Sequence, residues 1–104
     1  MTKMKAEEQL VWVMYDITDD RDRRRIVKAT QEAGLYRVQY SVFLGTIRPN
    51  RLDELCLQIE DNIDEDNDRV YIFPMCSKDF KKVVTYGQAF DEKLINDEVK
   101  ALFF

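Results

Sequence analysis

The chain has 104 residues, of which 45% are hydrophobic, and its 16 basic and 20 acidic residues give a net charge of −4. This length predicts a single domain over 1–104, with a polar N-terminal extension over 1–9 and a C-terminal arm over 90–104. Residues 1–9 lack the apolar core of a signal peptide, and no segment approaches the roughly 18 apolar residues of a membrane span. We therefore expect a cytoplasmic protein with no membrane partner.

The residue types present also restrict the chemistry. The chain has no histidine, so Ser-His-Asp and Cys-His catalysis are excluded within it. Cys56 lies in a helical apolar stripe and Cys76 has no short-spaced partner, so neither a zinc site nor a disulfide is expected. If the chain hydrolyses anything, water activated by a carboxylate-bound metal is the most economical nucleophile.

The negative net charge hides an uneven distribution. Residues 53–68 hold eight acidic residues and no basic one, so the rest of the chain has 16 basic against 12 acidic residues, a net charge of +4. Because the local field matters more than the total charge, this distribution is compatible with binding a polyanion.

The first predicted element is a strand over 11–17, an apolar run typical of a strand buried on both faces. Asp16 lies near its end, and the basic cluster 21–25 follows at once. An acid at an exposed strand end beside several guanidinium groups can hold a cation next to a phosphate. A phosphodiester is therefore the first substrate class to consider.

A helix is predicted next, over about 20–33. Thr18, Asp19 or Asp20 can cap its first turn, and Gly34 suits the left-handed position just past its end.

Residues 36–44 alternate in the pattern of one strand. We expect the larger apolar set to face the helices and the second set to form an interface or ligand surface. The first set is Tyr36, Val38, Tyr40, Val42 and Leu44, and the second is Arg37, Gln39, Ser41 and Phe43.

The remaining elements complete an alternating order of strands and helices. A second helix is predicted over about 51–63, a strand over 69–75 and a further short strand over 83–86. This order indicates an α+β, ferredoxin-like (βαββαβ-type) sandwich with an extra C-terminal strand. Two helices cover one face of such a sheet, so we expect self-association through Phe43 and Arg37 to cover the other.

Four stretches in this order and spacing resemble a known family: V-M-Y-D-I-T, R-D-R-R-R-I-V-K, Y-R-V-Q-Y-S-V-F and R-V-Y-I-F-P-M-C. Over about residues 10–87 the chain is similar to the second of the core adaptation proteins of CRISPR systems, a family described as endoribonucleases. The resemblance implies a ferredoxin-like homodimer that cleaves single-stranded RNA, or in some members duplex DNA, and that bridges integrase subunits during spacer insertion.

The resemblance also implies a site. The two copies of Asp16 would meet across the two-fold axis and bind one Mg²⁺, and the other site positions would fall on Tyr15, Arg23, Arg25, Arg37 and Phe43. Protons compete with metal for paired carboxylates, so we expect weaker metal binding in acid than toward alkaline pH. The nucleic-acid-binding set is Arg21, Arg23, Arg24, Arg25 and Lys28.

Each candidate residue also has a structural alternative. Asp16 could cap the following turn, the arginines could form a solvated helix face, and Tyr15 and Phe43 could be packing residues. The acidic segment 53–68 could be a solvated helix edge or a surface for an integrase subunit.

Three functions follow from these expectations. The preferred one is a homodimeric, Mg²⁺-dependent endonuclease of CRISPR adaptation, with Asp16 as metal ligand. The second is a non-catalytic scaffold that holds DNA between integrase subunits. The third is a toxin-like RNA-cleaving relative with the same fold.

Overall fold

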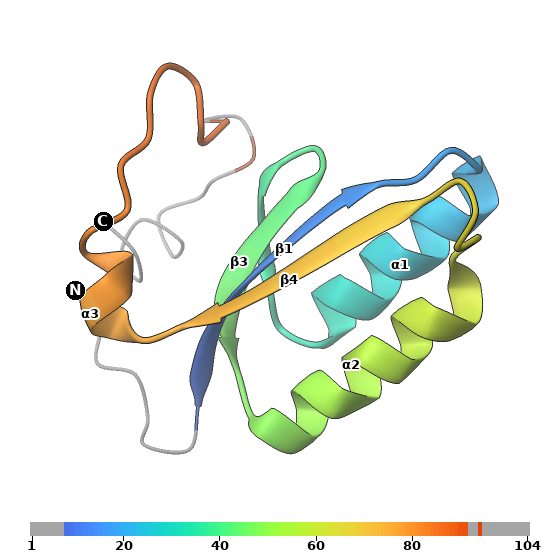
Figure 1. Ribbon diagram of the computed structural model, residues 1–104, viewed down its shortest axis with the longest axis horizontal. Coiled ribbons are helices and arrows are strands. Elements are labelled where there is room, and N and C mark those ends of the chain that lie inside the picture. The colour runs from blue at the N-terminus through green and yellow to red at the C-terminus, as the bar shows by residue number, and fades with distance from the viewer. Residues whose placement is uncertain (1–7, 92–93, 95–104) are drawn as a thin grey trace.

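The computed structural model describes residues 8–91 and residue 94 (Figure 1). In this part of the chain, no helix has the length and apolarity needed to cross a bilayer. The elements are β1 (Gln9–Asp16), α1 (Asp20–Glu32), β2 (Tyr36–Gln39), β3 (Val42–Ile47), α2 (Pro49–Asn62), β4 (Arg69–Met75) and α3 (Ser77–Phe80).

The four strands form one antiparallel sheet in the order β2-β3-β1-β4. Helix α1 connects β1 to β2, and β3 lies between these two strands, as in a split βαβ unit. Both long helices cover the same face of the sheet (Figure 1). The predicted α+β, ferredoxin-like architecture is therefore confirmed, and β1 lies inside the sheet with a hydrogen-bonded neighbour on each side.

The main core lies between the sheet and the two long helices. Val11, Val13 and Tyr15 of β1 point into it, because alternate side chains of a strand share a face. The helices contribute apolar positions at helical spacing, and burial of this shared layer is the main force that holds the helices on the sheet. The helical members buried in the cluster are Ile26, Ala29, Leu55 and Ile59.

The single strand predicted over 36–44 is wrong, because a turn at Tyr40 and Ser41 divides it into the hairpin β2–β3. The predicted faces are also inverted. Phe43 is completely buried in the helix-covered core, whereas Val38 and Leu44 lie on the opposite face with Trp12. Both faces of this sheet are apolar, so apolar content alone could not identify the face that meets the helices.

The chain itself covers part of the second face. Phe80 of α3 and Phe90 each lie with their ring centroids 6.0 Å from that of Trp12. The segment between them forms no strand, so the short strand predicted over 83–86 is not present. Only residues 90, 91 and 94 of the predicted C-terminal arm fall within the described part, and most of the predicted extension over 1–9 lies outside it.

Both ends of α1 follow from local sequence. The Asp19 side chain caps the helix by accepting from the backbone N–H groups of Arg21, at 2.8 Å, and Asp22, at 3.0 Å. At the other end, Gly34 has φ of 91°, and the N–H groups of Gly34 and Leu35 return to helical carbonyls in a Schellman arrangement.

The Asp19 cap makes the stability of the fold pH-dependent. The backbone hydrogen bond from Asp22 is the main cause that lowers the pKa of Asp19 below its ordinary value of 3.8, although burial opposes it. A group whose pKa falls on folding stabilises the protein above the unfolded value, and this contribution is lost as the pH falls through the folded value. We therefore expect Asp19→Ala to lower the thermal midpoint at pH 7, with a smaller difference from wild type at about pH 3.

Asp19→Asn is the matched control, because asparagine caps a helix equally well but does not titrate. It should keep the midpoint at pH 7 near that of wild type in thermal melts followed by circular dichroism. A difference between wild type and Asp19→Ala that is equally large at both pH values would contradict the ionic cap.

Candidate functional site at the end of strand β1

Asp16 ends the internal strand of the sheet with an exposed carboxylate. Its side chain is 78% exposed, and its Oδ2 lies 3.8 Å from Nη1 of Arg69, the residue paired with it on β4. By strand alternation Asp16 shares a face with Trp12 and Met14, the face that α1 and α2 leave uncovered. The alternative was that Asp16 caps the following turn, but among the described residues the carboxylates that accept from backbone N–H groups there are those of Asp19 and Asp68.

The loop that follows Asp16 is fixed by side chains from two other segments, the loop before β4 and helix α1. Asp68 is 8% exposed, and its two oxygens accept from the backbone N–H groups of Thr18, at 3.0 Å, and Asp64, at 2.9 Å. Arg23 donates to the Ile17 carbonyl at 3.2 Å and also pairs with the carboxylate of Asp20. Asp16 is therefore presented from a rigid strand end, and Arg23 contacts the residue next to it.

Tyr15 and Arg37 form a separate cluster on the other face of the sheet. The Tyr15 hydroxyl donates to the Tyr40 carbonyl at 2.6 Å and accepts from Nη2 of Arg37 at 3.0 Å. Nε of Arg37 also donates to the Tyr40 carbonyl, at 3.1 Å. Because adjacent residues of a strand point to opposite faces, this cluster and the Asp16 carboxylate are not brought together.

The interface predicted through Phe43 is corrected by its burial. Phe43 has no exposed surface, and its ring lies beneath the guanidinium of Arg37, with Cζ 5.6 Å from the ring centroid. Tyr15 lies beside it, with the two ring centroids 6.3 Å apart. These contacts match the packing alternative for Phe43 and for Tyr15, and they give Arg37 aromatic and carbonyl partners within its own subunit.

The remaining basic residues lie along the outer face of α1. Arg21, Arg24, Arg25 and Lys28 are exposed and follow the i, i+3, i+4, i+7 spacing of one helical face; we call these four residues the α1 basic stripe. Arg25 lies 3.9 Å from Asp22, and Lys28 lies 4.0 Å from Glu32. Within the described part, Arg21 and Arg24 have no carboxylate at ion-pair distance, so they are the most available for a phosphate.

The described part of the chain does not assemble a metal site from its own acids. Across residues 8–91 and residue 94, no group of three acidic or cysteine side chains is arranged to hold a metal ion. Asp16 stands alone, and the cation nearest to it is Arg69. Mg²⁺ retains several waters and accepts few carboxylates, so a second carboxylate from another subunit would complete a set of the kind this ion uses.

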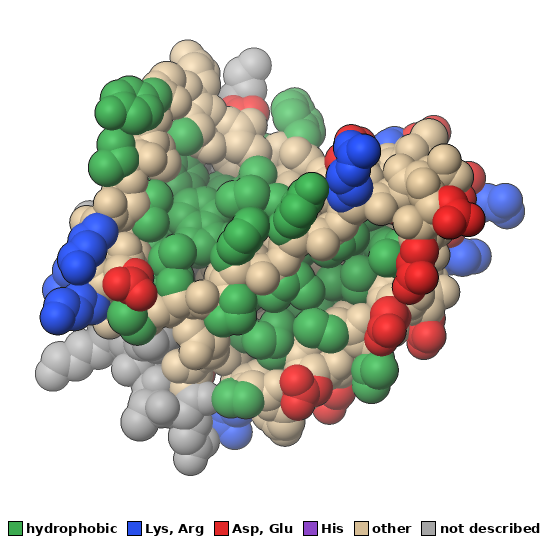
Figure 2. All heavy atoms as spheres, in the orientation of Figure 1, with side chains coloured by type: hydrophobic (Ala, Val, Ile, Leu, Met, Phe, Trp, Pro, Cys, Tyr) green, Lys and Arg blue, Asp and Glu red, His purple; other side chains and the backbone are tan. Residues whose placement is uncertain are grey.

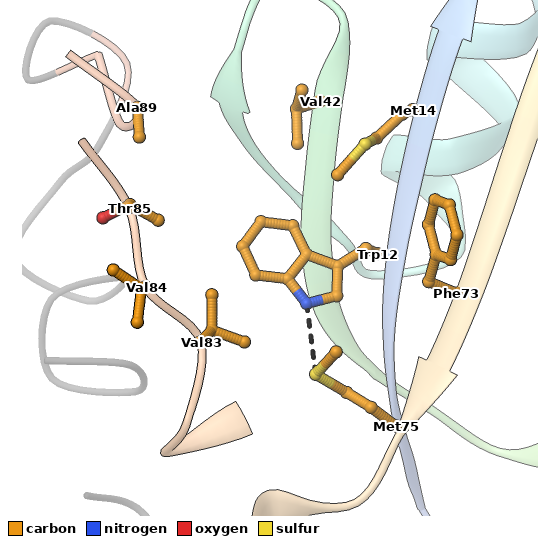
Figure 3. A pocket seen from close by; sticks show the side chains of 9 residues that line it. All are labelled: Trp12, Met14, Val42, Phe73, Met75, Val83, Val84, Thr85 and Ala89. Atoms are coloured by element: carbon orange, nitrogen blue, oxygen red, sulfur yellow. Dashed lines mark hydrogen bonds between the residues drawn. The ribbon is translucent and has the colours of Figure 1, made fainter. Parts of the chain in front are cut away.

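An apolar hollow of about 450 Å³ lies on the face that carries Asp16 (Figures 2 and 3). Trp12, Met14 and Phe73 line its sheet side, and Val83 and Val84 line the opposite wall. Nε1 of Trp12 lies 3.3 Å from the sulfur of Met75, drawn as a dashed line in Figure 3. Beside the hollow, Tyr71 and Phe73 stack with centroids 6.1 Å apart, yet they remain 51% and 46% exposed.

Sequence reasoning did not identify Arg69, Asp68 or Tyr40 as parts of these sites. Arg69 was placed at the start of a strand, but only the register shows that it lies opposite Asp16. Asp68 was one of eight acids in the segment taken as a solvated edge or partner surface. Tyr40 was predicted inside a strand, but it forms a turn with the polar residue that follows it, Ser41.

The hydroxyl of Tyr15 has a structural role that can be measured. Tyr15→Phe removes the donor to the Tyr40 carbonyl and one acceptor for Arg37, so we expect the free energy of unfolding to fall by about 1 kcal/mol. Urea denaturation measures this difference, and Tyr86→Phe, at a tyrosine that is 86% exposed, is the matched control. An unchanged midpoint for Tyr15→Phe would contradict the structural role of the hydroxyl.

The comparisons with known proteins agree with this architecture. The family model described as CRISPR associated protein Cas2 matches residues 9–83. The CRISPR-associated endoribonuclease Cas2 1 of Archaeoglobus fulgidus is 41% identical over 66 residues, which are 64% of this chain and 70% of that protein. The CRISPR-associated endoribonuclease Cas2 of Desulforudis audaxviator is 39% identical over 69 residues, 66% of this chain and 65% of that protein.

A solved structure shows the same likeness. The crystal structure of Streptococcus pyogenes Cas2 superposes with a TM-score of 0.59 at 26% identity, covering 75% of this chain and 99% of that chain. The matched residues 9–83 contain β1, the hairpin β2–β3, both long helices and β4. The chain belongs to the CRISPR-associated Cas2 family.

Proposed function

We propose that this protein is a homodimeric, magnesium-dependent endonuclease that acts in the cytoplasm during CRISPR adaptation and cleaves single-stranded RNA or duplex DNA. The observation that carries the proposal is the position of Asp16, an exposed carboxylate at the end of an internal strand, on the sheet face that α1 and α2 leave uncovered. The names of the relatives from Archaeoglobus fulgidus and Desulforudis audaxviator, both endoribonucleases, support the same reaction class.

The dimer we propose forms through this second face of the sheet. Figure 2 shows hydrophobic side chains over much of this side of the molecule. Tyr71 and Phe73 are half-exposed there, in a chain of a size that gains stability from further burial. In a two-fold pairing a residue meets its own copy only near the symmetry axis, so the dimer that we propose has the Asp16 of each subunit close to that axis. This surface replaces the interface that we predicted through Phe43 and Arg37.

Two Asp16 carboxylates, one from each subunit, would hold the magnesium ion. The chemistry that this ion supplies when bound is activation of water and neutralisation of charge on the phosphodiester. Arg69 would be released from its ion pair with Asp16 when the carboxylate takes a metal, and its guanidinium would then be available to another anion. A substrate phosphate is the natural replacement, so Arg69 joins the phosphate-binding groups.

Arg23 and the α1 basic stripe would hold the nucleic acid beside this centre. Arg23 donates to the carbonyl of Ile17, the residue directly after Asp16, and this contact supports a role for its charge in neutralising a phosphate held near Asp16. Arg21, Arg24 and Arg25 extend the positive surface outward along the helix. Their contacts are with phosphates and carry no sequence information, so binding is expected to be electrostatic and sequence-independent.

The nuclease proposal is tested by the carboxylate itself. Purified wild-type protein should cleave single-stranded RNA with Mg²⁺ and stop when the metal is chelated, and Asp16→Asn should reduce cleavage to background because it removes the metal ligand. Asp53→Asn, an exposed acid on α2, is the matched control and should cleave like wild type. Equal cleavage by wild type and Asp16→Asn would exclude this site.

A second variant tests the dimer. Phe73→Asp places a charge on the proposed contact face, so it should sediment as a monomer and lose cleavage although Asp16 is intact. Leu57→Asp, at a residue 61% exposed on α2, should remain a dimer and cleave normally. Circular dichroism shows whether both variants are folded. A folded Phe73→Asp dimer would remove this surface from the proposal.

A non-catalytic scaffold is the second candidate, and one observation favours it. Each subunit contributes one carboxylate, that of Asp16, to the proposed metal site but several exposed arginines to the surface beside it. Such a surface suits DNA binding better than hydrolysis. In this role the α1 basic stripe binds duplex DNA while an integrase subunit performs the reaction. The exposed acids of α2 and of the loop after it offer a surface for a basic partner of that kind.

Salt dependence measures the contribution of the stripe. Each arginine that contacts a phosphate adds about one to the slope of log affinity against log salt concentration. We expect Arg24→Ala to weaken duplex DNA binding and to reduce this slope by about one. Arg48→Ala, at the start of α2, is a charge-matched control that should leave the slope unchanged. If spacer acquisition fails with Arg24→Ala but survives Asp16→Asn, the scaffold is the biological role.

A further inference from the structure

We propose that Tyr40 is a base-stacking residue that holds an unpaired nucleotide beside the Asp16 end of β1. This inference rests on the proposed nuclease function and adds a residue that contacts the base rather than the phosphate. Tyr40 belongs to none of the groups considered so far for metal, phosphate or dimer contacts. Tyr40 stands at the turn between β2 and β3, and the residue is 67% exposed.

The backbone of Tyr40 is held more tightly than that of an ordinary turn residue. Its carbonyl accepts two hydrogen bonds, at 2.6 Å from the Tyr15 hydroxyl and at 3.1 Å from Nε of Arg37. The same guanidinium lies with Cζ 6.0 Å from the Tyr40 ring centroid and 5.6 Å from that of Phe43. A stack of a buried phenyl, a guanidinium and an exposed phenol therefore rises from the core to the surface.

Packing alone does not account for the aromatic ring. Arg37 is already positioned by the Phe43 ring, the Tyr15 hydroxyl and the Tyr40 carbonyl, so it does not need a second ring to hold it in place. Tyr40 buries only about a third of its surface, and a large apolar ring in that position gains little from folding. An exposed ring on a backbone held by two hydrogen bonds is, however, well suited to receive a planar ligand, because less conformational entropy of the backbone remains to be lost.

The turn that carries Tyr40 also lies at the end of the sheet where β1 ends. The backbone N–H of Tyr15 donates to the Ser41 carbonyl at 3.1 Å, so the turn runs beside the residue that precedes Asp16. The Tyr40 ring packs against Arg37, on the face away from the Asp16 carboxylate, so a strand whose phosphate is held near Asp16 would pass around the end of the sheet to place a neighbouring base on Tyr40. Bases in a duplex are already stacked on one another, so the residue favours a single strand.

A binding experiment separates stacking from charge. We would measure the affinity of full-length protein for a single-stranded RNA of about 12 nucleotides and for the matching duplex, without divalent metal. Tyr40→Leu should weaken single-strand binding roughly 5- to 100-fold and leave duplex binding unchanged, whereas Tyr40→Trp should retain or strengthen single-strand binding. Tyr86→Leu, at another exposed tyrosine, is the matched control.

A base analogue gives a direct reading of the contact. Placed in the same RNA, 2-aminopurine should change its fluorescence on binding to wild type and to Tyr40→Trp, and should show a smaller change with Tyr40→Leu. Equal single-strand affinities for wild type and Tyr40→Leu, with both proteins folded, would overturn the stacking role. That result would leave the nuclease proposal standing, because the nuclease proposal depends on cleavage by wild type and its loss in Asp16→Asn.

Discussion

Every feature of the candidate sites depends on β1 lying inside the sheet with both of its faces covered by apolar groups. Hydrogen bonds to β3 on one side and β4 on the other leave the strand no freedom of register. A shift by one residue would exchange the two faces and would bury Asp16 against the helices. The apolar sequence before Asp16 is therefore what fixes the carboxylate at the sheet end and the Tyr15 hydroxyl on the other face.

The alternation of side chains along β1 divides the site residues into two groups with different roles. The face away from the helices carries Asp16, its ion-pair partner Arg69 and the exposed rings of Tyr71 and Phe73. The helix face carries Tyr15, whose contacts with Arg37 stabilise the β2–β3 turn. The side chains of adjacent residues in the family motif therefore do not lie together. Asp16 serves the proposed reaction, whereas the Tyr15 side chain stabilises the fold.

The sequence predicted the elements well where the physical signal is local. The bounds of β4 were predicted correctly, Gly34 takes the expected left-handed position just past the end of α1, and Asp19 is among the residues predicted to cap that helix. The hairpin was missed because residues 36–44 alternate through the turn without glycine or proline, so nothing local marks Tyr40 and Ser41 as a break. The inverted faces and the contact between Asp16 and Arg69 depend on pairing between distant segments, which periodicity within one strand does not contain.

The buried carboxylate of Asp68 joins two loops that are 50 residues apart, because it accepts from Thr18 on one side and from Asp64 on the other. Displacement of the Asp68 carboxylate would release both backbone groups, because one side chain holds the two. The connection after β1 and the connection before β4 should therefore unfold locally as one cooperative unit, with matched rates of amide hydrogen exchange. Asp68 therefore controls how often the segment after β1 opens, although it is not part of the proposed metal or phosphate site.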